Sequence, residues 1–386
     1  MTESQRREPS WLDDTWRRAL SRTSARFGLA WIGLVTVCAA FAPLLANSRP
    51  LLLVQHGQWM SPALQALTPT DAVCLVAAVC FALSLFARIG ISRRLLLVSV
   101  VSVLSMPLCW LMFDPPRITV YEQYRSDAFV AESAWVVRAP VPFSPRDYQR
   151  DLAQQSFQPP SAQHWLGTEE NGASVLSRLI HAARIALGIG FIATGLAVLL
   201  GILIGGLMGY LAGWADLLGM RLVEVFEAVP TLFLLLAFVA FFGNNLYVLM
   251  LIIGVTSWPA YARYVRAEFL RLREQDFVQA ARVSGLPLES VLFRHLLPNA
   301  LAPLLVAMSF GFAAAILAEA TLSFLGLGPV DAPSWGQMLN QAVRSSRFVW
   351  WMALFPGGAI FMTVLSYNLI GEALRDAVDP HGDLAQ

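Results

Sequence analysis

Residues that could do acid–base, nucleophilic or metal chemistry are few in this chain and do not form a recognisable site. All 27 of its Lys and Arg residues are arginine, which excludes a P-loop lysine, a Schiff-base lysine and a lysine general base. The five histidines and four cysteines show no Cys-x-x-Cys or paired-histidine spacing, and no H-E-x-x-H or G-x-S-x-G occurs. We therefore predict no catalytic residue, no metal site and no cofactor here. If ATP drives this protein, another chain must bind it.

Composition places the chain in a membrane. Hydrophobic residues make up 56% of it and charged residues only 14%, far from the balance of a soluble domain. The formal net charge of +1 gives no support to nucleic-acid binding, which usually needs a strongly basic face. All four cysteines fall inside apolar runs, so we interpret them as small core hydrophobes.

The apolar blocks predict an all-α polytopic membrane protein with about eight transmembrane helices. Each block is close to the length that crosses a hydrocarbon core of about 30 Å. The expected spans are Gly28–Ala46, Ala72–Ala87, Leu95–Phe113, Ile185–Ala212, Ala228–Phe242, Leu246–Ala262, Ala300–Leu322 and Phe348–Ile370.

Arginine placement predicts the orientation. Arginines gather in the N-terminal segment, the 88–94 loop, the 213–221 turn, the 263–294 loop and the tail, which we therefore place in the cytoplasm. Both termini are then cytoplasmic, and residues 114–181 form an external, periplasmic segment. The sequence of residues 1–27 is compatible with two structures, an amphipathic helix on an anionic leaflet or a solvated basic tail.

Small residues mark a packing stripe on the fourth span. Gly201, Gly205, Gly209 and Gly213 recur at four-residue intervals, which lets another helix approach the backbone closely. Glycine is common in membrane helices, so the stripe could also reflect composition alone.

A few polar residues lie in or beside apolar runs. Glu319, with Ser323, is a candidate for the substrate pathway because an ionisable group at such depth is costly without a cavity or partner. The alternative places it near the outer end of the helix, capped by neighbouring hydroxyls. Glu224 and Glu227 favour a helix-start or pairing role, and Thr168 followed by two glutamates predicts a helix N-cap.

The segment 263–299 is too long and too regular for a plain connector. Its periodic apolar residues include Phe277 and Leu286, and Gln279-Ala280-Ala281 leads to Gly285, where a left-handed turn can end a short helix. Leu297-Pro298 then predicts entry into the next span. We expect a short helix, roughly parallel to the membrane, with small residues that permit close docking of a partner.

These motifs resemble those of ABC importer permeases. Gln279-Ala280-Ala281-x-x-x-Gly285 with Leu297-Pro298 is similar to the cytoplasmic loop of that family, with Gln279 and His295 departing from its general pattern. The resemblance to dipeptide and oligopeptide permeases continues over about 164–380, and within that branch the Yej-type peptide permease is the most similar. The resemblance to the dipeptide and oligopeptide permeases rests on these further stretches: His164–Thr168, Leu176–Leu179, Ala318–Gly326, Ser334–Gly336 and Gly371–Asp376. The resemblance to the Yej-type permease rests on Ala46–Leu51, Ala134–Val136 and Asn171-Gly172.

The resemblance implies a type I importer core at 182–376, with the coupling loop 263–299 and a cytoplasmic tail at 377–386. It implies coupling to an ATPase through Phe277, Gln279, Ala280, Ala281, Arg282, Gly285, Leu286, Arg294, His295 and Pro298. The implied partners are a homologous permease, two cytoplasmic ATPase subunits that bind ATP and Mg²⁺, and an external solute-binding protein, in a bacterial inner membrane.

Several alternatives stay open from the sequence. The cargo implied is a di- or oligopeptide or a peptide antibiotic, and nickel or another small solute is the runner-up because such permeases share one fold. An exporter or channel subunit and a membrane-embedded enzyme are the rival classes. Residues 72–113 have no counterpart in the usual six-helix pattern and are expected to be an extra helical pair at the periphery.

Overall fold

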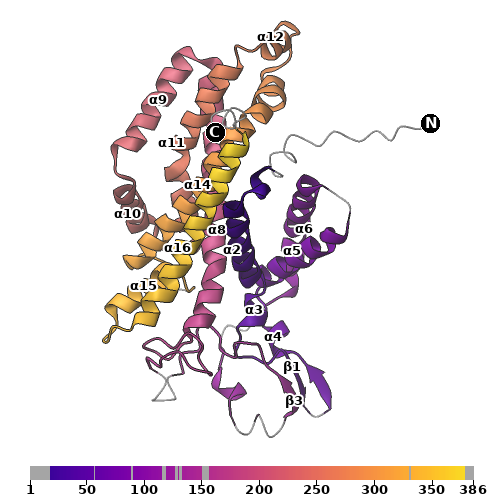
Figure 1. Cartoon of the computed structure of the whole chain (residues 1–386), viewed down its shortest axis with the longest axis vertical. Helices are drawn as coiled ribbons and strands as arrows, with labels where there is room; N and C mark the ends of the chain where they lie inside the picture. Colours follow the sequence, from indigo (N-terminus) through magenta and orange to yellow (C-terminus); the bar gives the residue numbers. More distant parts are fainter. Residues whose placement is uncertain are drawn as a thin grey trace, which may run out of the picture. The chain divides into compact units, whose positions relative to one another are not determined.

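A computed structural model describes residues 18–55, 57–87, 90–114, 119–126, 129, 133–149, 156–329 and 332–378. It is mostly helical (Figure 1). The chain forms two compact units. Unit 1 comprises the described parts of 1–32, 186–330 and 360–386, and unit 2 those of 33–185 and 331–359.

The prediction of an all-α polytopic membrane protein is confirmed. Six helices of the described residues are long and apolar enough to cross a membrane, and a bent pair of helices would make a seventh. A shorter apolar helix, Leu96–Met112, accounts for the predicted span Leu95–Phe113. The six are α2 (Thr23–Ala40), α5 (Pro69–Phe86), α8 (Val175–Leu211), α11 (Leu246–Leu272), α14 (Leu297–Phe324, with the turns from Leu288) and α16 (Trp350–Val378).

The bent pair corrects two predicted boundaries. α9 (Gly213–Ala228) and α10 (Thr231–Phe242) meet at 83°, so the expected span Ala228–Phe242 really begins after Pro230. Proline lacks the N–H that a helix interior needs and disfavours helical backbone at the residue before it. Residues 213–221, expected as a turn, form the first half of α9 instead.

The predicted cytoplasmic loop 263–299 is shorter than expected. α11 continues through Arg263 to Leu272 and α14 begins at Leu297, which leaves residues 273–296 between the two. This segment contains α12 (Asp276–Val283), α13 (Leu288–Ser290) and a turn of π-helix, η2 (Val291–Leu296). Figure 1 shows α12 at one extremity of unit 1.

Unit 2 holds the extra helical pair. α5 and α6 (Ile91–Met112) pack against each other, as expected for residues 72–113. α5 starts at a capping box, in which Thr68 Oγ1 accepts from the Asp71 amide at 3.2 Å and Asp71 Oδ2 accepts from the Thr68 amide at 2.8 Å. Asp71 also pairs with Arg184 of α8, which ties the start of the helical pair to the start of α8.

A small antiparallel sheet in unit 2 was not predicted. Its strand order is β2-β1-β3, with β1 (Leu52–Gln55) pairing both β2 (Gln58–Met60) and β3 (Ser133–Val137). Gly57, with φ of +75°, turns the β1–β2 hairpin. The remaining short elements of this unit are α3 (Ala42–Leu45), α4 (Pro62–Gln65), η1 (Glu122–Tyr124) and α15 (Trp335–Arg344).

Two further expectations change, at the start of the chain and of α8, and a third is not tested. The predicted span Gly28–Ala46 is α2, from Thr23 to Ala40, followed by α3. The segment 114–181, predicted to be external, ends in a helix, because α8 already begins at Val175. Trp11, Leu12, Trp16 and Arg17 of the predicted amphipathic segment lie outside the described residues.

The Thr168 N-cap is wrong. Its hydroxyl accepts from the Gln158 amide at 2.8 Å, and its carbonyl accepts from Trp351 Nε1 at 3.1 Å. The following Glu169 forms a buried ion pair with Arg178 of α8. Burial raises the pKa of Glu169 above its usual value, and the charge of Arg178 offsets this increase only in part. The two glutamates that suggested a first helical turn therefore belong to a loop that is fastened to α8.

Candidate functional site

The segment between α11 and α14 folds into a short helix with a defined end. After α12, the Gly285 amide donates to Arg282 O at 3.0 Å and the Leu286 amide donates to Ala281 O at 3.3 Å. This is the hydrogen-bond pattern of a Schellman motif, which needs a left-handed residue after the C-cap. Gly285 has φ of +72°, so the predicted left-handed turn is confirmed.

One face of α12 is buried in unit 1. Val278 and Ala281 join a core cluster that contains Phe269 and Leu272 from the end of α11 and Val291 from the π-helix. The half-buried Gln279 donates from Nε2 to Arg273 O at 2.9 Å, across the turn that joins α11 to α12. α12 is therefore fixed to the end of α11 on this side.

Arg282 fastens α12 to a third helix. Its guanidinium carbon lies 4.6 Å from the centroid of the Tyr210 ring on α8, and its Nε donates to Tyr210 Oη at 3.2 Å. Cation–π contact and hydrogen bond act together here. The structure thus gives Arg282 an anchoring position, while the sequence resemblance had grouped it with residues that contact a partner.

Other apolar residues of this segment are exposed. The side chain of Val283 is 89% exposed. Solvent-facing apolar groups gathered in this way mark protein contact sites. The other large exposed apolar residues of the segment are Phe277, Leu286, Leu288 and Phe293. Val283, Leu288 and Phe293 were missed in the sequence, although their types alone could have suggested an apolar docking face.

The remaining predicted coupling residues differ in their exposure to solvent. Ala280, Arg294 and Pro298 are exposed together with Gly285, whereas His295 is half-buried and lies in the π-helix. The carbonyl of His295 accepts from Asn299 Nδ2 at 2.7 Å. We use the name α12 surface for these exposed residues of α12 and of the segment that follows it: Phe277, Ala280, Val283, Gly285, Leu286, Leu288, Phe293 and Arg294.

The predicted glycine stripe lies along α11. A Cβ atom at Gly201 would come within 2.5 Å of Tyr261 Cβ, and one at Gly209 within 2.7 Å of Phe269 Cβ. At Gly205 it would meet the Ala262 backbone, with Cα only 2.8 Å away. Gly213 is different because it lies beyond the end of α8 and has nothing within 4 Å.

Glu319 is buried, with an exposed fraction of 2%, and accepts a hydrogen bond of 2.5 Å from Ser323 Oγ on the same helix. This bond matches the alternative in which a neighbouring hydroxyl caps the carboxylate. A substrate contact for Glu319 and Ser323 therefore stays a prediction. Glu227 pairs with Arg263 at 2.9 Å and Glu224 with Arg221 at 2.5 Å, which agrees with the pairing role expected of both.

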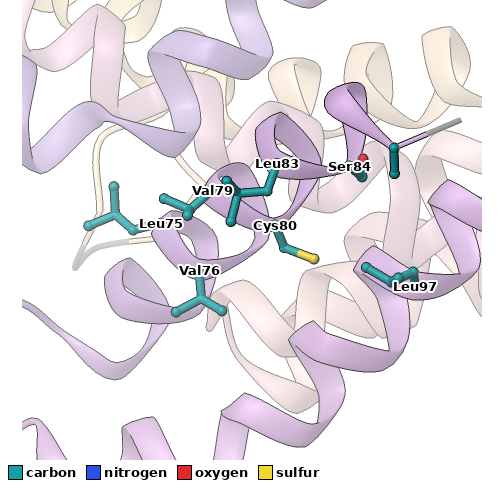
Figure 2. A pocket seen from close by; sticks show the side chains of 8 residues that line it. Leu75, Val76, Val79, Cys80, Leu83, Ser84 and Leu97 are labelled. Carbon is teal, nitrogen blue, oxygen red and sulfur yellow. The ribbon is translucent and has the colours of Figure 1, made fainter.

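The hollow between α5 and α6 offers no chemistry for a polar substrate. It has a volume of about 560 Å³ and is lined mainly by aliphatic side chains of α5, with Leu97 from α6 facing them (Figure 2). The Ser84 hydroxyl in its wall donates to Phe81 O of its own helix at 2.6 Å. Across the described residues, no group of three or more His, Cys, Asp or Glu side chains could hold a metal ion.

Two family models match the chain. Residues 201–381 match the binding-protein-dependent transport system inner membrane component, and residues 10–61 match the N-terminal TM domain of oligopeptide transport permease C. Neither model covers residues 62–200, which contain α5 and α6.

Curated relatives and solved structures are similar as well. The dipeptide transport system permease protein DppC of Alkalihalophilus pseudofirmus is 39% identical over 225 residues, which cover 58% of this chain and 74% of that protein. A putative peptide permease protein of Brucella suis is 41% identical over 248 residues, covering 63% and 81%. Among solved structures, the inward-facing MetNI methionine ABC transporter has a TM-score of 0.42 at 18% identity, covering 52% of this chain and 96% of that one.

Proposed function

This chain belongs to the inner-membrane components of binding-protein-dependent transport systems, in the dipeptide and oligopeptide permease branch, and we propose that it forms half of the pathway of an ATP-driven peptide importer. Peptide cargo is supported by the relatives, which are named as dipeptide and peptide permeases. The structural observation that carries the proposal is the α12 surface, a set of exposed and mostly apolar residues on and after a short helix whose buried face packs against the end of α11.

In this proposal the α12 surface contacts a cytoplasmic ATPase subunit. A force on that surface passes to α11 through Val278 and Ala281, and to α8 through Arg282 and Tyr210. The close glycine contacts between α8 and α11 would keep these two helices together as they move. ATP-dependent movement of α12 would thus tilt transmembrane helices and open the pathway to alternate sides of the membrane.

The proposed assembly contains a homologous permease, two ATPase subunits that hold ATP and Mg²⁺, and an external binding protein. The chain spans a bacterial inner membrane many times, with both termini in the cytoplasm. This orientation is supported by the arginines of the α12 segment, Arg273, Arg282 and Arg294, which would face the cytoplasm.

We expect peptide uptake and ATP hydrolysis to require the complete assembly. The chain alone has no lysine for a phosphate loop, so purified and reconstituted by itself it should neither hydrolyse ATP nor transport. In proteoliposomes that also contain its permease partner, ATPases and binding protein, uptake of radiolabelled peptide should depend on added ATP. Sustained ATP turnover by the isolated chain, or ATP-driven uptake of a metal ion with no peptide uptake, would contradict the proposal.

The extra helical pair should be dispensable for the core activity. Deleting Ala72–Phe113 with a short Gly/Ser splice keeps Asp71, and with it the ion pair to Arg184. Because the deleted hollow offers only apolar walls, Cys80 and Ser84, we expect a substantial fraction of peptide uptake to remain. Uptake should be compared at equal amounts of assembled complex, and complete loss in a correctly assembled deletion would refute a peripheral role.

A further inference from the structure

Unit 2 contains a second, polar cavity of about 270 Å³ away from the hollow between α5 and α6. Its volume is several times the roughly 30 Å³ that one water occupies in the liquid, so it has room for a small polar group. The wall comes from the end of α3, the turn after α4, the start of α5, two loops and the first turns of α8. Its polar side chains are Asn47, Arg49, Thr68, Asp71, Thr119, Tyr121, Ser144 and His181.

The loop that carries Arg49 is held firmly in place. Asn47 Oδ1 accepts from the Arg49 amide at 3.0 Å and from Ser144 Oγ at 3.2 Å, while its Nδ2 donates to Pro43 O at 3.0 Å. Ser48 and Ser144 exchange two further bonds, of 2.7 and 2.9 Å, through their amides and hydroxyls. Binding at this cavity would therefore order little additional backbone, which favours affinity.

The charges of the wall do not balance. Asp71 pairs with Arg184, and the nearby Asp147 pairs with Arg125 at 2.5 Å. Arg49 donates to Thr119 Oγ1 at 2.7 Å, and within the described part of the chain it pairs with no carboxylate. Each acid here is thus matched to a different arginine, which leaves the guanidinium of Arg49 as an excess positive charge at a concave surface.

Tyr121 adds a neutral donor beside Arg49. Burial and the charge of Asp147 raise the pKa of Tyr121 above its usual value, and the opposing effects of Arg49, Arg146 and a hydrogen bond with Ser144 offset this only in part. The phenol therefore stays protonated at neutral pH. A guanidinium next to a protonated phenol matches a carboxylate or phosphate group, since arginine binds both through paired charge-assisted hydrogen bonds.

We propose that this cavity binds a small oxyanion, a carboxylate or a phosphate group, with Arg49 as its counter-ion. The cavity is too small for a long peptide but accepts a terminal carboxylate, free phosphate or a lipid headgroup. The Asn47-x-Arg49-Pro50 sequence then has a role distinct from the α12 surface: it presents the cation from a rigid loop. The proposal does not depend on the peptide-importer function, because anion binding can be measured without transport.

Isothermal titration calorimetry of the full chain in phosphatidylcholine nanodiscs tests it, with sodium phosphate, sodium acetate and the dipeptide Ala-Ala as probes. We expect binding of at least one anion in the wild type and a loss of about ten- to a hundredfold in affinity in Arg49→Gln, the range of one charge-assisted bond. Arg49→Lys should bind more weakly than the wild type but more tightly than Arg49→Gln, because it keeps the charge and loses the paired hydrogen bonds. Arg138→Gln is the matched control, because Arg138 is exposed in the same unit, lines no part of the cavity and donates to Tyr124 O at 3.1 Å.

Thr119→Val distinguishes loss of the charge from a local structural change, because it removes the hydrogen bond from Arg49 to Thr119 and keeps the cation. It should weaken binding far less than Arg49→Gln. Binding of Ala-Ala but not of its C-terminal amide identifies a peptide carboxylate as the source. Weaker binding of the soluble anions by the wild type in phosphatidylglycerol than in phosphatidylcholine nanodiscs, with no such lipid effect in Arg49→Gln, identifies a lipid headgroup as the source. Absence of Arg49-dependent binding of all three probes and of any lipid effect, or an equal loss in Arg138→Gln, overturns the proposal.

Discussion

Replacing Gly285 with aspartate is expected to leave membrane insertion normal but to abolish most binding of the ATPase subunits and most peptide uptake. Gly285 adopts a φ of +72°, where an ordinary side chain costs about 1–2 kcal/mol. A Cβ atom there would meet nothing within 4 Å of this chain, so no clash inside the permease should add to that cost. The larger penalty would come from a charge placed inside an apolar docking contact.

Gly57 provides the matched control for this experiment. It also has a positive φ, of +75°, and open space where a Cβ atom would lie, but it belongs to the β1–β2 hairpin of unit 2. Gly57→Asp therefore carries the same backbone strain and the same charge away from the α12 surface. ATPase pull-down and uptake should be near normal in Gly57→Asp and strongly reduced in Gly285→Asp. Equal behaviour of the two variants would remove the coupling role from the α12 surface.

The sequence located the membrane helices because long uncharged runs have only one stable environment. It did not locate their ends. α11 runs ten residues past the predicted end at Ala262. Its last turns are amphipathic and pack against α12, so mean hydropathy falls although the helix continues. The break at Pro230 was not predicted either, because a proline inside an apolar run can either kink a span or separate two helices.

Contacts between residues distant in sequence could not be predicted. β1 pairs with β3 through Leu53 and Val136, and the chain between them includes α4, α5 and α6, so no local sequence pattern predicts the sheet. The same reason explains Arg282, whose partner Tyr210 lies 72 residues earlier on α8. By contrast, the turn at Gly285 is local, and the residue type alone indicated its left-handed backbone.

The charged loop before α8 shows how a correct local pattern can have a different cause. Thr168 and the two following glutamates fit the start of a helix, yet Glu169 pairs with Arg178 across the loop. Both side chains are almost fully buried, and a buried charge without its partner is strongly destabilising, so the ion pair contributes more than a contact with a helix N-terminus would. Tertiary pairing of a buried charge thus outweighed the local capping preference.

Gly205→Leu should produce the largest loss of stability in unit 1. A side chain there meets Ala262 Cα and its carbonyl carbon at 2.8 and 2.9 Å, and backbone atoms cannot rotate away as a flexible side chain would. α8 and α11 must then separate along the whole stripe, which also loosens Gly201 and Gly209 from Tyr261 and Phe269. Forced overpacking of this kind costs roughly 1–3 kcal/mol or more.

Gly195 lies on the same helix, and a Cβ atom added there would have nothing within 4 Å, so Gly195→Leu changes α8 by the same residue without touching α11. Thermal unfolding in detergent, followed by tryptophan fluorescence, should show a midpoint lowered by several degrees in Gly205→Leu and almost unchanged in Gly195→Leu. Because the proposed force from α12 reaches α8 partly through this contact, Gly205→Leu should also reduce uptake at temperatures where the protein is still folded. A stable and fully active Gly205→Leu would show that the two helices are not held together by the glycine stripe.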